Sequence, residues 1–215
     1  MCFVNRKAIL LGSSCLVVIV ILSISFFLYR YSKLKCVDTL LQEQTLVFED
    51  MQRLQAGDFV FRMGYGLASL LLENGGGACG VSHCGILVGD TAQLAVIHSI
   101  SGSLSEQDGV QICTLETFLK EAKPHSFVAM RLKRGNIQAI VSEAYRYLSL
   151  HPAFDLTFNM RDTTTLFCSE LLHRVLQNTH QIQIFDDMQN ALSFKCFFTS
   201  EIFDIIIDQR TFAKL

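Results

Sequence analysis

Apolar and polar positions follow two different patterns along this chain, and the changes between them predict its elements. Short apolar runs bounded by turn residues, typical of strands, occupy 58–62, 82–90, 93–100, 109–113 and 126–133. Apolar residues spaced by three and four, typical of amphipathic helices, occupy 37–55, 67–73, 114–122, 136–150 and 169–178. A last apolar segment, 198–208, is expected to form a short helix followed by a strand. Between them, 74–80 is a glycine-rich stretch expected to form a loop at the rim of a cleft.

The order of these elements predicts the fold class. Strands that follow one another closely and are then joined by helices indicate an antiparallel sheet with helices packed against it, an α+β fold. We divide the chain into residues 1–35, 36–56 and 57–215: an N-terminal membrane anchor, a connecting helix and one folded domain. The domain is long enough to bury a sizeable core.

The N-terminal segment differs from the rest of the chain. Ala8–Tyr29 contains no charged residue and is long enough to cross a bilayer as a helix. Bulky residues at its C-terminal end do not form a signal-peptidase site, which indicates an uncleaved single span. Basic residues flank both ends, so the charge bias is small; we expect the domain on the non-cytoplasmic side.

Composition removes some functional classes and leaves the cysteines to be explained. The formal net charge is −2 with acids and bases interspersed, which provides no basic surface for nucleic acid. Eight cysteines at irregular spacing do not define a disulfide framework, and most lie among apolar or glycine residues, as reduced cysteines do. This feature favours a reducing compartment, in conflict with the expected orientation.

Cys168 is the first candidate for chemistry. It lies at the predicted start of the helix over 169–178, after three threonines (163–165) that are suitable N-cap residues. The positive end of a helix dipole favours thiolate over thiol, whereas the alternative is a small core residue of that turn. Glu170 suits the first turn, although its charge would oppose a lowered thiol pKa.

Two of the six histidines are candidate proton carriers for such a thiol. His83 begins one predicted strand and His98 interrupts the next, positions where an imidazole without a partner is costly. If the strands are hairpin neighbours, both rings lie on one face. The remaining histidines, 125, 151, 173 and 180, are expected to be solvated or structural.

Five segments in order resemble the permuted papain-like amidases of the YiiX/YaeF type, in the NlpC/P60 superfamily. They are GDFVF (57–61), SHCGILVGD (82–90), AVIHSISG (95–102), GVQICTLETFL (109–119) and FDLTFNMRDTTTLFCSELL (154–172). The resemblance covers about Gln55 to Asn178. It implies a circularly permuted papain-like fold, in which the histidine strand precedes the cysteine helix.

The resemblance also implies roles for individual residues. Cys168 becomes the nucleophile, His83 the proton carrier and His98 the group that orients His83. Glutamate is expected at the position of His98, so a dipole replaces a charge there. Candidates for shaping the substrate cleft are Ser82, Asp155 and Asn159. No cofactor and no metal are implied.

Three functional hypotheses follow. The first is a membrane-anchored cysteine hydrolase or acyltransferase that acts on amide or ester bonds, with an envelope or lipid-linked substrate favoured by the anchor. The second is a zinc site formed by Cys79, His83, Cys84 and His98, although their spacing matches no common zinc motif. The third is a catalytically silent binding module of the same fold.

Overall fold

The computed structural model describes residues 20, 21, 23–25, 44–65, 69, 79–90, 93–185, 194–199 and 201–210. The chain divides into two units, Met1–Gln42 and Glu43–Leu215. In the first unit, residues 20, 21 and 23–25 are helical; the rest of the predicted span lies outside the described residues. Within the described part of the chain, no helix has both the length and the apolar character needed to cross a membrane.

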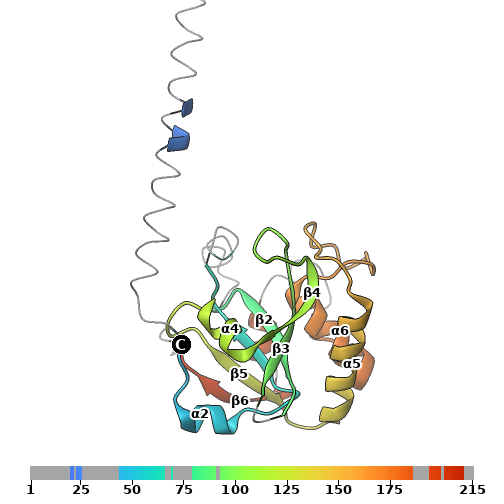
Figure 1. Cartoon of the computed structure of the whole chain (residues 1–215). Coiled ribbons are helices and arrows are strands. Elements are labelled where there is room, and N and C mark those ends of the chain that lie inside the picture. The colour runs from blue at the N-terminus through green and yellow to red at the C-terminus, as the bar shows by residue number, and fades with distance from the viewer. Residues whose placement is uncertain are drawn as a thin grey trace, which may run out of the picture. The chain divides into compact units, whose positions relative to one another are not determined.

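The second unit is built on one antiparallel sheet with the strand order β4-β3-β2-β1-β5-β6 (Figure 1). The strands are β1 (Phe59–Arg62), β2 (His83–Val88), β3 (Ala95–Ile100), β4 (Gly109–Thr114), β5 (Val128–Leu132) and β6 (Phe203–Asp208). The helices are α2 (Phe48–Arg53), α4 (Leu115–Lys120), α5 (Ile137–Leu150), α6 (Cys168–His180) and α8 (Lys195–Thr199). The predicted α+β class is confirmed.

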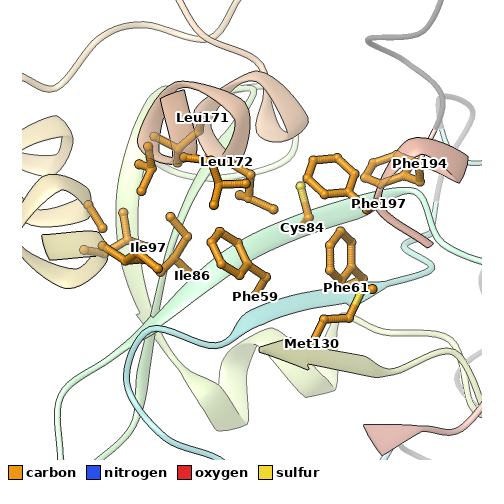
Figure 2. Close-up of a cluster of buried hydrophobic side chains, with 14 of the residues drawn as sticks. Phe59, Phe61, Cys84, Ile86, Ile97, Met130, Leu171, Leu172, Phe194 and Phe197 are labelled. Atoms are coloured by element: carbon orange, nitrogen blue, oxygen red, sulfur yellow. The ribbon is translucent and has the colours of Figure 1, made fainter. Parts of the chain in front are cut away.

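Two apolar clusters lie on opposite faces of the sheet because successive side chains of a strand point to opposite sides. Cys84 and Ile86 of β2 belong to the cluster that includes Leu171 and Leu172 of α6. Figure 2 shows these strand side chains directed toward the helix, with Phe197 of α8 beside them. The other cluster contains Leu87, Val96 and Phe118, the last from α4. The faces are named below after α6 and α4.

One predicted helix is shorter than expected. Of the helix predicted over 37–55, residues 37–43 lie outside the described residues, and α2 begins only after Val47, which is extended. Gln44 explains the difference, since its buried side-chain amide donates to Gln209 Oε1 (2.5 Å) and accepts from Ser126 N (3.3 Å). These tertiary hydrogen bonds hold residues 44–47 against the sheet and outweigh their helical periodicity.

The short helix predicted near the C-terminus begins earlier in the chain than expected. The short helix expected after residue 198 is α8, which begins at Lys195 and ends at Thr199, and the strand after it is β6. Most of the helix predicted over 67–73 and most of the loop predicted over 74–80 lie outside the described residues; Cys79 and Gly80, the described end of that loop, form a turn.

Candidate active site

The first turn of α6 is capped differently from the sequence prediction. The N-cap residue is Phe167, whose side chain makes no capping hydrogen bond, so the threonine cap was wrong. Thr164 and Thr165 instead bond to Asp162 (Oγ1 to carboxylate, 2.6 and 3.1 Å). Glu170, the third helical residue, accepts from the main-chain N–H of Phe167, which is the reciprocal half of a capping box. Glu170 therefore positions the helix start that carries Cys168.

Glu170 is fully buried and only partly compensated. Its Oε1 accepts from Arg174 Nε and Nη2 (3.2 and 3.0 Å), while Oε2 has no hydrogen-bond partner among the described residues. Burial raises the pKa of Glu170 to about 7, against the opposing effect of Arg174. A neutral Glu170 at mildly acidic pH removes the negative charge that would otherwise disfavour a Cys168 thiolate.

This raised pKa predicts a pH-dependent stability. The folded-state pKa exceeds the unfolded value, so the stabilisation is complete below about pH 4 and is lost as pH rises through 7. The expected loss of unfolding free energy between pH 5 and 8 is at most about 3 kcal/mol. Glu170→Gln, which keeps the capping acceptor, should abolish that part of the pH dependence in urea titrations. An equally steep loss in the variant would contradict this origin.

Cys168 is the first residue of α6, as the sequence indicated, and its side chain is partly buried on the α6 face. Its thiol is hydrogen-bonded to the thiol of Cys84, and it accepts from the main-chain N–H groups of Cys84 and Ser169. These hydrogen bonds lower the pKa of Cys168, although burial opposes them. The hydrogen bond with the Cys84 thiol has the largest effect. Burial raises the pKa of Cys84 well above its ordinary value.

His83 and His98 form a direct pair on the α4 face. Strands β2 and β3 are antiparallel neighbours, and His83 Nε2 lies 2.8 Å from His98 Nδ1. The ring of Phe118 contacts both imidazoles, with centroids 5.8 and 5.9 Å away. The expectation that the two rings share one face is confirmed. The pair uses Nε2 of His83 and leaves Nδ1, the nitrogen nearer the main chain, for another partner.

Cys168 approaches the histidine pair at the main chain of β2. Alternation directs the His83 ring to the α4 face and the Cys84 thiol to the α6 face, where Cys168 packs. The amide that donates to Cys168 belongs to the peptide joining His83 to Cys84. Among the described residues, no hydrogen bond joins the Cys168 thiol to the His83 ring. The structure therefore brings the thiol to the strand that carries His83 without ring-to-thiol contact.

The three cleft candidates are engaged in internal hydrogen bonds. Asp155 is buried and accepts from Thr157 N and Oγ1 (both 2.7 Å) and from Asn159 N (2.5 Å), so it shapes the loop before α6. Asn159 Oδ1 accepts from Arg161 N (3.2 Å). Ser82 Oγ accepts from Gly64 N (2.9 Å) and donates to Ser69 Oγ (2.8 Å). All three thus support loops around the site.

Two further residues belong to the site. Cys84, named from the sequence only as a candidate zinc ligand, is the thiol neighbour of Cys168. Arg62, which was not singled out from the sequence, lies opposite His83 in the register of β1 and β2. The only available signal for Arg62 was a charge at the end of an apolar strand. Its position beside the histidines depends on strand pairing, which one sequence does not reveal.

Contacts or exposure define the surroundings of three of the four histidines that were expected to be structural or solvated. His173 is buried and stacks on Phe185 at a centroid distance of 4.4 Å. His180 Nε2 accepts from Asn136 N (2.8 Å), next to the start of α5. His151 is the exposed C-cap of α5 in the left-handed conformation (φ 49°).

The residues of the zinc hypothesis do not fit a metal site. His83 and His98 direct ring nitrogens at each other in a hydrogen bond, and Cys84 points to the opposite face. No group of three or more potential ligands that could hold a metal ion occurs among the residues that the structure describes. The five described cysteines (Cys79, Cys84, Cys113, Cys168 and Cys196) are free thiols.

The antiparallel sheet and the helices packed against it form a YiiX-like fold. The structure is similar to a solved structure, that of the metalloprotein yiiX from Escherichia coli O157:H7, with a TM-score of 0.59. The match covers 74% of this chain and 99% of that chain at 18% identity, so it concerns the fold. No family model and no curated protein matches the sequence.

Proposed function

We propose that this protein is a cysteine hydrolase or acyltransferase acting on amide or ester bonds, with Cys168 as nucleophile, His83 as proton carrier and His98 as orienting group. The observation that supports it best is the 2.8 Å hydrogen bond between His83 Nε2 and His98 Nδ1. His98 holds the His83 ring through Nε2, so Nδ1 of His83 is left for proton transfer. The helix start beside the same strand supplies the thiol.

The proposed reaction proceeds through an acyl-enzyme. The Cys168 sulfur attacks the carbonyl carbon as its proton passes to His83, and the carbonyl oxygen becomes an oxyanion near the N–H groups of the helix start. His83 then gives that proton to the departing amine or alcohol, and the carbonyl–heteroatom bond breaks. Water or another acceptor next releases the acyl group and restores the thiol. In this proposal, His83 Nδ1 comes within hydrogen-bond distance of the thiol only when substrate is bound.

Acetylation by an aryl ester tests this proposal. With p-nitrophenyl acetate, the full chain in detergent should release a burst of p-nitrophenolate and carry one acetyl group on Cys168, located by mass spectrometry. Cys168→Ser should remove the burst, whereas Cys196→Ser, which alters another partly exposed thiol, should keep it. Acetyl groups spread evenly over Cys113, Cys168 and Cys196 would favour the silent binding module.

Membrane attachment and the substrate class belong to the same proposal. The charge-free run Ala8–Tyr29 supports a single span. The proposal places the domain on the non-cytoplasmic side. A catalytic domain held near a bilayer fits an amide- or acyl-bearing substrate of the envelope or of lipids. The description of yiiX as a metalloprotein is not carried over, because His83 and His98 here direct ring nitrogens at each other in a hydrogen bond.

A further inference from the structure

A buried arginine completes the surroundings of the histidine pair. Arg62, the last residue of β1, lies directly opposite His83 in the antiparallel register, which places their side chains on the same face. Its guanidinium carbon lies 4.8 Å from the centroid of Phe118, the ring that contacts both imidazoles. Residues from β1, β2, β3 and α4 thus form one cluster, Arg62–His83–His98–Phe118.

The charge of Arg62 is compensated only at its outer end. Nη2 pairs with Glu121 Oε2 at 2.7 Å, and Nη1 bonds to the Glu121 carbonyl. Glu121 is 46% exposed, whereas Arg62 is 4% exposed. Its buried Nε has no hydrogen-bond partner among the described residues. Because Glu121 is solvated, it offsets the charge of Arg62 only partly. Arg62 therefore keeps a strong electrostatic effect on the buried groups beside it.

We propose that Arg62 is a positioning residue for this site: its buried positive charge, opposite His83 in the strand register, keeps His83 and His98 unprotonated at rest. The inference rests on the proposed function, because that function makes His83 the proton carrier of Cys168. Protonation of either ring would place a second positive charge beside Arg62 in a site with little water.

The electrostatics agree with this geometry. The charged group that acts on both histidines is Arg62, and Glu121, Cys113 and Cys168 act on Arg62. Burial first, and then the charge of Arg62, lower the pKa of His83 well below its usual value and that of His98 to about 3. Burial lowers the pKa of Arg62, and the charges of Glu121, Cys113 and Cys168 oppose that effect.

The proposal gives His83 a specific role in the proton path. A neutral His83 can accept the thiol proton during attack, and the imidazolium formed beside Arg62 is a stronger acid than a free histidine. It therefore returns the proton readily to the leaving group. The charge of Arg62 makes neutral His83 a weaker base and protonated His83 a stronger acid. A stronger acid suits a poor leaving group such as an amine.

Histidine NMR of the full chain in detergent tests the assignment. With carbon-13-labelled histidine, His83 (identified by its loss in His83→Asn) should remain neutral at pH 6.5, the usual histidine midpoint. Arg62→Met should raise its proton affinity at least about tenfold, one pH unit. Arg62→Lys, which keeps the charge, should leave it within about twofold, and Glu121→Gln should not raise it.

Three results would overturn the proposal. These are a wild-type His83 that is half-protonated near pH 6.5, equal shifts in Arg62→Met and Arg62→Lys, or a raised affinity in Glu121→Gln. If Arg62→Met does not fold, the wild-type midpoint and the other two variants still decide. If Cys168 resists acetylation while His83 titrates as stated, the proposed function fails and the electrostatic role of Arg62 stands.

Discussion

Replacing His83 with asparagine is expected to lower the rate of Cys168 acetylation and deacetylation by about 10²- to 10⁴-fold, the usual contribution of a positioned acid–base group. The reason is that His83 receives the thiol proton and returns it to the leaving group. Its ring is held by His98 at 2.8 Å and by contact with Phe118. Asparagine fits the half-buried position at the start of β2 and removes the titratable nitrogen.

The pH profile separates this role from a packing role. Because burial and Arg62 lower the pKa of His83 well below 6.5, wild-type acetylation should lose no rate to His83 protonation between pH 8 and pH 6.5. The matched control is His151→Asn, since His151 is an exposed helix C-cap with positive φ, which asparagine tolerates. Rates for His83→Asn within twofold of wild type would rule out His83 as the proton carrier.

Replacing Asp58 with alanine is expected to lower the free energy of unfolding by about 3 kcal/mol, near the lower end for breaking a buried ion pair. Asp58 is fully buried, and its carboxylate accepts from Arg131 Nε and Nη2 (2.7 and 2.9 Å) and from Gln55 N (2.9 Å). Alanine would leave the arginine and a turn amide without their acceptor. Arg131 is 27% exposed, so water recovers part of the loss.

Urea unfolding of the full chain, followed by circular dichroism, measures this effect. Asp50→Ala is the matched control, because Asp50 pairs with Arg53 at 3.4 Å on an exposed helix and should cost less than about 1 kcal/mol. Equal losses in the two variants would contradict a structural role for the Asp58–Arg131 pair. Asp58 immediately precedes the strand that carries Arg62, so the pair also supports the histidine cluster.

Local patterns predicted most of the elements near the site. Asn136 caps α5 and Thr114 caps α4 through side-chain hydrogen bonds, as is common for these residue types. The strands that contain His83 and His98 and the helix that begins at Cys168 lie where periodicity indicated. Such elements are determined by neighbouring residues, so one sequence is enough to find them.

Predictions failed where distant contacts competed with local preference. Residues 44–47 are extended because Gln44 bonds to Gln209 and Ser126, which are far away in the sequence. The threonines before α6 do not cap it, since Asp162 binds two of them and Glu170 reaches back to Phe167. In both cases a tertiary or competing side-chain partner satisfied groups that local rules had assigned elsewhere.

The sequence by itself determined the α+β class, the helix start at Cys168 and the two strand histidines, because periodicity and residue chemistry are local properties. Only the tertiary structure decided how these groups meet. Strand register placed Arg62 beside His83, and side-chain alternation directed the His83 ring and the Cys84 thiol to opposite faces. Register and facing depend on which strands pair, and pairing is settled by the packing of the whole sheet.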